Sequence, residues 1–215
     1  MNLPKGIIFD MDGTLVDNIP FHKDAWLSFL GANGLLLSAE DFQAQNHGTL
    51  IEMMARFFPD ITDLGLLNDK GQEKEAAYRK LYAPYLEEIK GLTPFLEKLK
   101  DAGVTLLLAT MGDTENIDFT LGKLRIGKYF SHITGGHEVR KGKPDPEIFQ
   151  RSLFKAGLAA EDCLVVEDSI GGVKAAVLAG IPVVGITTSH SAEELIDAGC
   201  VRAFGDFEEM QEAFV

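Results

Sequence analysis

The fold is decided by one early stretch of the chain, Gly6-Ile7-Ile8-Phe9-Asp10-Met11-Asp12-Gly13. Its first four residues form an unbroken apolar run, which is typical of a parallel strand buried on both faces of a sheet. Three later runs have the same character: Val104 to Ala109, Cys163 to Val166 and Val183 to Ile186. Helical patterns separate these runs, and strands that alternate with helices predict a doubly wound, Rossmann-like α/β fold with a parallel sheet.

Residues 17–88 break this alternation and read as successive helices. The predicted helices are Phe21 to Leu30, Ser38 to Ala44, Thr49 to Phe58 and Glu73 to Leu86. In the first of them, apolar side chains recur at helical spacing and define one buried face. We therefore expect a Rossmann-like catalytic core made of residues 1–16 and 89–215, with residues 17–88 inserted as a helical cap.

Composition and charge exclude several classes of protein. The 215 residues carry a formal net charge of -13, which would repel nucleic acid and anionic lipid. No apolar stretch is long enough to span a bilayer, and the first residues lack the pattern of a secretory signal. The two cysteines, Cys163 and Cys200, lie far apart in apolar contexts and predict free buried thiols. We expect a cytoplasmic monomer that binds neither nucleic acid nor membrane.

Two acidic residues close the first predicted strand. Because side chains alternate along a strand, Asp10 and Asp12 point the same way, and Gly13 lets the backbone turn sharply after them. Ligands of open α/β sheets bind at the carboxyl ends of the strands, so both carboxylates face the expected pocket. Adjacent carboxylates need a cation, and Mg²⁺ suits an all-oxygen site. A simple Asx-type turn is the alternative interpretation, and it would be preferred if this motif stood alone.

Further polar groups follow the ends of later elements. Thr110 and Met111 end the second predicted strand and can offer a hydroxyl and backbone N–H groups to a phosphate. Lys143 precedes a stiff, proline-flanked helix start, which would hold it in place. Glu167 and Asp168 end the third strand and bring two more acids to the same sheet edge. Each has an ordinary explanation alone, as a strand end or a solvated lysine, but that much buried like charge requires a cation.

The order of these motifs resembles that of the haloacid dehalogenase superfamily. Its four motifs are matched in sequence order by Asp10-x-Asp12-Gly13-Thr14-Leu15, Thr110, Lys143-Pro144 and Glu167-Asp168. The resemblance covers essentially the whole chain. Within the superfamily, the stretches Asn18 to Trp26 and Gly142 to Phe149 are most similar to the β-phosphoglucomutase-like phosphatases and mutases, which have a small helical cap after the first motif.

This resemblance implies an enzyme that transfers a phosphoryl group through an aspartyl phosphate. Asp10 would be the nucleophile, and Asp12 would act as general acid and base. The implied Mg²⁺ ligands are Asp10, the backbone carbonyl of Asp12, Asp168 and, directly or indirectly, Glu167. The implied phosphate ligands are Thr110, Met111 and Lys143.

Two cap histidines bear on the choice of substrate. His22 resembles a cap-hinge histidine of the mutase-like group, although a half-buried packing histidine is an equal alternative. His47 stands where the mutases carry a cap lysine, and Ile51 replaces their arginine. A bisphosphate intermediate needs a cation to hold its second phosphate, so both differences disfavour a mutase. Other cap cations that could substitute are Lys70, Lys74, Arg79 and Lys80.

We therefore expect a magnesium-dependent phosphatase that hydrolyses a small phosphorylated metabolite, such as a sugar phosphate. A β-phosphoglucomutase-type mutase is the main alternative. A non-catalytic phosphoacceptor module is a third hypothesis, but storage of phosphate on Asp10 needs neither an acid and base at Asp12 nor a long cap.

Overall fold

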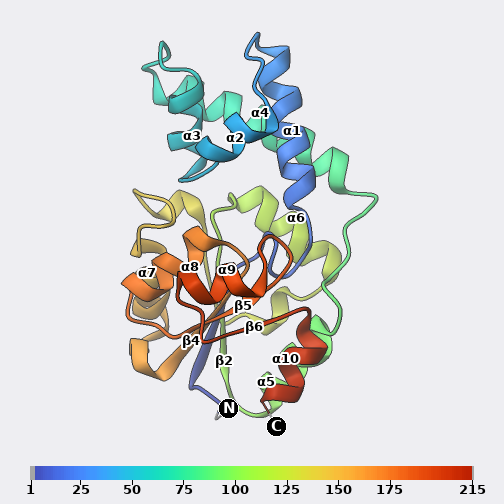
Figure 1. The fold of residues 1–215 in the computed structure, drawn as a ribbon, viewed down its shortest axis with the longest axis vertical. Coiled ribbons are helices and arrows are strands. Elements are labelled where there is room, and N and C mark those ends of the chain that lie inside the picture. Colours follow the sequence, from blue (N-terminus) through green and yellow to red (C-terminus); the bar gives the residue numbers. More distant parts are fainter. Residues whose placement is uncertain (1–2, 215) are drawn as a thin grey trace.

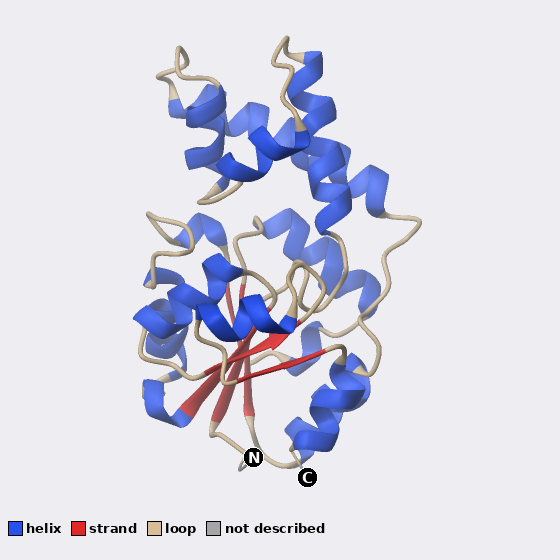
Figure 2. Cartoon of the chain, in the orientation of Figure 1, coloured by secondary structure: helices blue, strands red, loops and turns tan. Residues whose placement is uncertain are grey.

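The computed structural model describes residues 3–214, which contain a six-stranded parallel sheet in the order β3-β2-β1-β4-β5-β6 (Figure 1, Figure 2). The strands are β1 (Gly6–Phe9), β2 (Thr105–Ala109), β3 (His132–Thr134), β4 (Cys163–Glu167), β5 (Val183–Ile186) and β6 (Arg202–Phe204). This is the strand order of a Rossmann-like sheet. The predicted α/β fold class is confirmed.

Alternation along the central strands explains why both faces of the sheet are buried. Ile7 pairs in register with Leu106 and Leu164, and these three side chains belong to one core cluster. Its neighbour Ile8 belongs to a second cluster on the other face. The edge strands β3 and β6 were not predicted, because each has only three residues and begins with an exposed polar side chain.

Helices cover the two faces of the sheet separately. One core cluster holds residues of α5 (Leu92–Asp101), α6 (Thr114–Leu124) and α10 (Phe207–Ala213). The other holds residues of α7 (Glu147–Ala156), α8 (Ile170–Leu178) and α9 (Ala192–Ala198). Short 3₁₀ turns complete the connections at Gly127–Tyr129, Gly136–Glu138 and Ala160–Asp162.

The segment between β1 and α5 forms a helical group beyond the carboxyl ends of the strands (Figure 1). Its helices are α1 (Ile19–Ala32), α2 (Ala39–Gln45), α3 (Leu50–Phe57) and α4 (Leu64–Tyr82). They pack around a core of their own, in which the Trp26 ring contacts those of Phe42 and Phe57. Two chain segments connect this group to the sheet, one before α1 and one after α4. They lie side by side, since Ile89 N donates a hydrogen bond to Leu15 O over 2.9 Å.

Helix α4 differs from the predicted helix Glu73 to Leu86. It begins nine residues earlier, where the Asp63 side chain accepts hydrogen bonds from the N–H groups of Gly65 and Leu66. Gly65 and Gly71 obscure this start in the sequence. Gly71 packs closely against α3, since a Cβ there would lie 2.8 Å from Leu50 Cδ2. No helix of the described residues is long and apolar enough to cross a membrane.

Candidate active site

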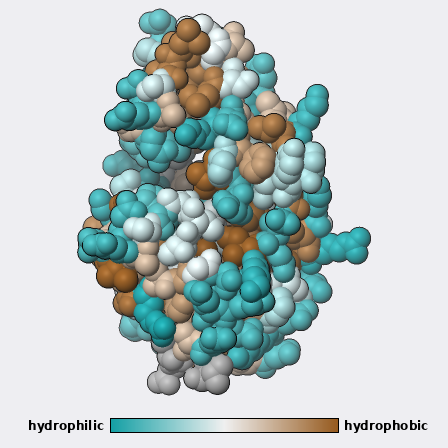
Figure 3. Space-filling model, turned by 45° about the vertical axis from the view of Figure 1, so that its right-hand side comes forward, coloured by the Kyte–Doolittle hydropathy of each residue, from teal (hydrophilic) through white to brown (hydrophobic). Residues whose placement is uncertain are grey.

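A cavity of about 400 Å³ lies between the helical group and the carboxyl edge of the sheet. Figure 3 shows the hollow that separates the two parts on one side of the molecule. Strands β2, β1 and β4 are neighbours in the sheet, so the residues after each of them meet at its floor. The predicted site residues in its lining are Asp10, Asp12, His22, His47, Thr110, Met111, Lys143, Glu167 and Asp168. A second depression, of about 920 Å³, lies beside the two segments that connect the helical group to the sheet, and none of the predicted site residues lines it.

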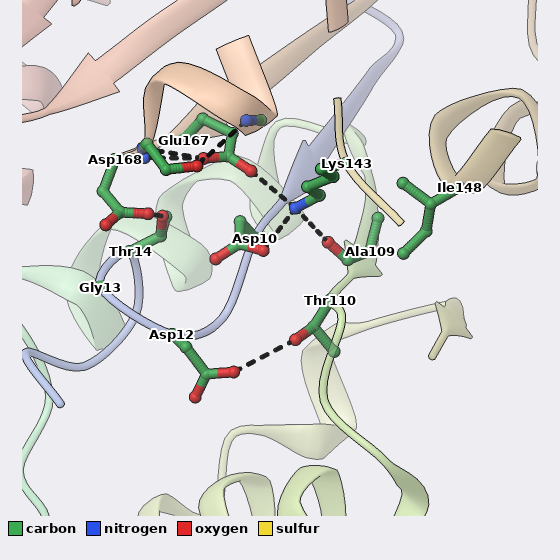
Figure 4. A network of polar contacts seen from close by, with 12 residues as sticks. Asp10, Asp12, Gly13, Thr14, Ala109, Thr110, Lys143, Ile148, Glu167 and Asp168 are labelled. Atoms are coloured by element: carbon green, nitrogen blue, oxygen red, sulfur yellow. Dashed lines mark hydrogen bonds and ion pairs between the residues drawn. The ribbon is translucent and has the colours of Figure 1, made fainter. Parts of the chain in front are cut away.

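Lys143 joins two of the carboxylates at the floor (Figure 4). Its Nζ donates to Asp10 Oδ1 and to Glu167 Oε1, both over 2.6 Å, and to the carbonyl of Ala109 over 3.2 Å. Burial opposes the charged ammonium, but the two carboxylates outweigh it and raise the pKa of Lys143. The lysine is therefore a fixed positive charge beside Asp10. We call Asp10, Lys143, Glu167 and Asp168 the strand-end cluster.

Glu167 is fully engaged by hydrogen bonds. Its Oε2 accepts from Asp168 N, Ser169 N and Ser169 Oγ, each over 3.0 Å, while Oε1 accepts from Lys143. Gly172 makes room for it, since a Cβ there would lie 1.8 Å from Glu167 Oε1. A carboxylate with this many partners is better suited to hold Lys143 and the start of α8 than to bind a ligand directly.

Asp168 is held at the side of the cluster that faces the turn after β1. It accepts hydrogen bonds from Thr14 Oγ1, over 3.2 Å, and from Ser189 Oγ. Gly13 packs directly against this carboxylate and has φ +84°, so a side chain there would meet both a strained backbone and Asp168 Oδ2. Gly13, the glycine of the first motif, thus lets the turn after β1 approach the Asp168 carboxylate at the end of β4.

The strand-end cluster contains three carboxylates and only one ammonium group. Oxygen atoms of Asp10, Glu167 and Asp168 all lie within 4.8 Å of one another, in an arrangement that could hold a metal ion. Burial is the largest cause that raises the pKa of Asp10 well above its ordinary value. Burial, followed by the charge of Glu167, raises the pKa of Asp168 to about 7. An all-oxygen donor set with uncompensated negative charge fits a hard cation.

Asp12 lies apart from this group and has a different environment. Its Oδ1 accepts from Asn18 Nδ2 over 2.5 Å, and its Oδ2 accepts from Thr110 Oγ1 over 3.4 Å. Burial acts to raise the pKa of Asp12, but the proximity of His22 and the hydrogen bond from Asn18 outweigh it and lower the pKa. Its predicted role as a metal ligand, which uses the backbone carbonyl, stays a prediction.

His22 connects Asp12 to the helical group. Its Nε2 lies 3.5 Å from Asp12 Oδ1, which is longer than a normal hydrogen bond. The ring stacks on Tyr78 with centroids 3.6 Å apart. Its Nδ1 lies 3.3 Å from the ammonium of Lys74, which is buried and bonds Glu75 over 2.9 Å. The histidine is thus both packed and in contact with the candidate acid and base.

The remaining predicted residues differ in how firmly they are held. Thr110 Oγ1 accepts from Gly112 N over 3.0 Å, which orders the loop that carries Met111. His47 reaches the cavity from the exposed loop between α2 and α3, where its Nδ1 lies 3.5 Å from Arg56 Nη2. Ile51 packs against the core of the helical group and does not line the cavity.

Several residues of the site were missed in the sequence. Asn18 orients Asp12 and also accepts from Gly13 N over 3.0 Å. Lys74 was considered only as a substitute cation, and neither Glu75 nor Asn116 was considered, although Asn116 Nδ2 donates to Glu75 Oε2 over 2.8 Å. Asn18 had a usable signal in the sequence, since this polar residue stands directly before the apolar start of α1. The others had none, because their partners lie on a distant helix.

Comparison with known proteins agrees with this geometry. A family model described as haloacid dehalogenase-like hydrolase matches residues 4–180. A phosphorylated carbohydrates phosphatase of Thermotoga maritima is 32% identical over 205 residues, which cover 92% of each chain. A phosphoglycolate phosphatase of Shigella boydii is 30% identical over 221 residues, which cover 90% of this chain and 85% of that one.

A solved structure extends the comparison to the fold. The crystal structure of a putative β-phosphoglucomutase from Thermotoga maritima superimposes with a TM-score of 0.71 and 28% identity, over 97% of this chain and 98% of that one. The resemblance inferred from the four motifs is confirmed, and the chain belongs to the haloacid dehalogenase-like hydrolase family of enzymes.

Proposed function

We propose that the protein is a magnesium-dependent phosphatase that hydrolyses a small phosphorylated metabolite, a sugar phosphate or a similar compound, through an aspartyl phosphate on Asp10. The observation that carries the proposal is the state of the Asp10 carboxylate. Lys143 binds its Oδ1, and no hydrogen bond within residues 3–214 reaches its Oδ2, although the side chain lines the cavity. One oxygen is thus anchored, and the other is available to attack phosphorus.

The residues that would hold Mg²⁺ are Asp10, Asp168 and the backbone carbonyl of Asp12, with Glu167 acting on the site through Lys143 and Asp168. The bound cation would offset the negative charge that the cluster leaves uncompensated. It would also neutralise part of the negative charge on the phosphoryl oxygens. Lys143, Thr110 and the backbone near Met111 would bind the other phosphate oxygens.

Two displacements at phosphorus complete the reaction. In the first, an Asp10 oxygen bonds to phosphorus, the bond to the substrate alcohol breaks, and Asp12 gives its proton to the leaving oxygen. In the second, Asp12 takes a proton from water, the water oxygen bonds to phosphorus, and the bond to Asp10 breaks. The products are the free alcohol and inorganic phosphate, and both aspartates return to their starting states.

The lowered pKa of Asp12 favours its ionised form, which is the form that the second step needs to accept a proton. The first step needs its protonated form, and a phosphate group arriving beside the carboxylate would raise its pKa by like-charge repulsion. His22 and Asn18, which contact Asp12 from the helical side, would hold its orientation in both steps.

We further propose that residues 17–88 act as a closing cap. The carboxylate of Glu52, in α3, accepts a hydrogen bond from Gly142 N over 3.0 Å, and Gly142 directly precedes Lys143. Backbone atoms of Gly48 pack so tightly on Gly142 that a Cβ there would lie 2.3 Å away. A cap that closes onto this loop would exclude bulk water and let the acceptor be chosen.

The test is a screen for phosphate release over sugar phosphates, phosphoglycolate, nucleotides and pyrophosphate, with and without Mg²⁺. We expect release that requires Mg²⁺ and disappears in Asp10→Asn, which keeps the shape of the side chain. Release that survives in Asp10→Asn would contradict the proposal. Isomerisation of glucose 1-phosphate primed with its bisphosphate, without net phosphate release, would favour the mutase alternative instead.

A further inference from the structure

The cavity has two ends of different chemistry. The strand-end cluster lies at one end and would hold the phosphoryl group, so the substrate alcohol must extend toward the other. That other end is formed by the helical group together with the start of α6. We call five of its lining residues on the helical group the cap wall, namely Trp26, Gln43, Asn46, Leu50 and Met53; His47 lines the cavity beside them.

The cations close to this end are already paired. The side chain of Lys74 is fully buried, bonds Glu75 over 2.9 Å and lies 4.7 Å from the centroid of the Trp26 ring. Arg79 bonds Asn116 Oδ1 over 2.8 Å and forms an ion pair with Glu115. Neither side chain can turn to a ligand without leaving a buried carboxylate or amide unpaired.

Carboxylates outnumber cations in this region. Arg79 also lies 3.9 Å from Asp113, which lines the cavity at the start of α6. Of the aspartate, glutamate, lysine and arginine side chains that line this end, Glu75 and Asp113 are carboxylates and Lys74 is the cation. Arg56 does not line the cavity and donates to the backbone carbonyls of Gln45 and His47. Within residues 3–214, an anionic group placed here would meet more carboxylates than ammonium groups and no unpaired lysine or arginine side chain in the lining.

Two free polar side chains at this end are neutral amides. No hydrogen bond within residues 3–214 involves the side-chain amides of Gln43 and Asn46, and both line the cavity. An amide both donates and accepts, which matches the hydrogen bonding of a hydroxyl group. Trp26, Leu50 and Met53 supply apolar surface beside them, which suits the C–H faces of a polyol or sugar.

From this arrangement, and resting on the proposed function, we propose that the substrate alcohol is uncharged and bears hydroxyl groups. The enzyme selects against an alcohol that carries a carboxylate or a second phosphate. Specificity of this kind comes from the unfavourable placement of the wrong charge as much as from contacts to the right substrate. The preferred class is the monophosphate ester of a sugar or polyol.

The test compares matched substrates that differ in one charge. Ethylene glycol monophosphate and phosphoglycolate differ only in a hydroxymethyl group against a carboxylate, and a hexose monophosphate is paired with its bisphosphate. With Mg²⁺, we expect kcat/KM to be at least about tenfold higher for ethylene glycol monophosphate and for the hexose monophosphate, whose alcohol parts carry no charge, than for their anionic counterparts. Like-charge contacts are costly in a desolvated site. Equal or faster hydrolysis of the anionic members would overturn the inference and leave the proposed phosphatase intact.

A variant ties the preference to the charge at Asp113. Asp113→Asn removes one carboxylate and keeps the cap of α6, because asparagine is an equally good N-cap residue. We expect the preference for ethylene glycol monophosphate over phosphoglycolate to narrow by about threefold or more, whereas Asp118→Asn on the exposed face of α6 should leave it unchanged. A preference that does not narrow in Asp113→Asn would overturn the inference. Phosphate release from none of these substrates would overturn the proposed function and the inference with it.

Discussion

The strand-end cluster and the cap wall face each other across one cavity but are built differently. The carboxylates of the cluster lie at the ends of β1 and β4, Lys143 reaches them from the loop before α7, and each of the four side chains is more than nine-tenths buried and hydrogen-bonded. On the cap wall, Gln43 and Asn46 are exposed and carry no side-chain hydrogen bond within residues 3–214. The groups proposed to carry out the reaction are therefore held firmly by the sheet and the loop before α7, whereas those proposed to select the substrate lie on a more exposed surface of the helical group.

The largest effect is expected from breaking the cluster at Lys143. In Lys143→Ala, the carboxylates of Asp10 and Glu167 lose their ammonium partner, and removal of one partner from a buried ion pair costs about 3–5 kcal/mol. We expect such a loss in the free energy of unfolding without Mg²⁺, measured by urea denaturation, and partial recovery with Mg²⁺.

Activity of the same variant should fall by about 10³-fold or more, because a charge that stabilises the transferring phosphoryl group is lost. Lys141→Ala, two residues away and exposed, is the matched control and should behave as the wild type. A Lys143→Ala protein as stable as the wild type in metal-free buffer would show that the cluster is not held by this lysine.

The second prediction separates the two roles of Asp12. Asp12→Asn should reduce hydrolysis of a sugar phosphate by about 10²–10⁴-fold, the usual contribution of general acid and base catalysis. With p-nitrophenyl phosphate, whose leaving group needs no proton, a rapid burst of one nitrophenolate per enzyme should precede a slow phase, because only the second step still lacks its base. Stopped-flow absorbance measures the burst.

The control for Asp12→Asn is Asp17→Asn, which makes the same change on an exposed residue nearby. An equally slow reaction of Asp12→Asn with both substrates, without a burst, would contradict the assignment of Asp12 as the acid.

The third prediction concerns pH. The pKa of Asp168 is raised from 3.8 to about 7, so the folded state keeps a proton that the unfolded state loses between these values. In the metal-free protein, this group therefore makes stability fall as the pH rises through that window. Mg²⁺ reverses the effect, because it favours the ionised carboxylate.

Thermal unfolding checks this expectation. The increase in Tm on adding Mg²⁺ should be clearly larger at about pH 8 than at about pH 5, with sodium chloride of equal ionic strength as the control. An increase that is equal at both values, or larger at the lower pH, would mean that a cation does not bind this carboxylate.

The smallest effect is expected at the contact between α3 of the helical group and the loop that carries Lys143. Glu52 Oε2 accepts from Thr49 N as well as from Gly142 N, and Glu52→Gln keeps an acceptor oxygen but weakens these bonds. We expect kcat/KM to fall by about two- to tenfold, with KM and kcat changing together because closure is affected. Glu73→Gln, an exposed residue of α4, is the matched control. Unchanged kinetics of Glu52→Gln would exclude this contact from closure.

The fold and the strand-end cluster could largely be predicted from the sequence. Parallel strands buried on both faces are unbroken apolar runs, and the residues after them must meet at one edge, so Asp10, Glu167 and Asp168 could be placed together without knowledge of any contact. Lys143 follows no predicted strand, and its place beside them was implied only by the family resemblance. The short edge strands gave no such pattern, because their side chains are partly exposed.

The cap side of the site could not be predicted in the same way. Helical periodicity gives the buried face of a helix but not its partner, so nothing in the sequence joins Lys74 to His22 or Glu75 to Asn116. The charge pairing that leaves this end without a free cation becomes visible only when α4 is placed against α6.

The central claim is that Asp10 carries the phosphoryl group during turnover. The direct measurement is to mix concentrated wild-type enzyme with Mg²⁺ and a hydrolysed substrate, quench in acid within the first turnover, and analyse the peptides by mass spectrometry. We expect the added mass of one phosphoryl group on Asp10, which hydroxylamine removes and which disappears as free phosphate forms. Steady phosphate release with no phosphoryl group on Asp10, or with one on another residue, would contradict it.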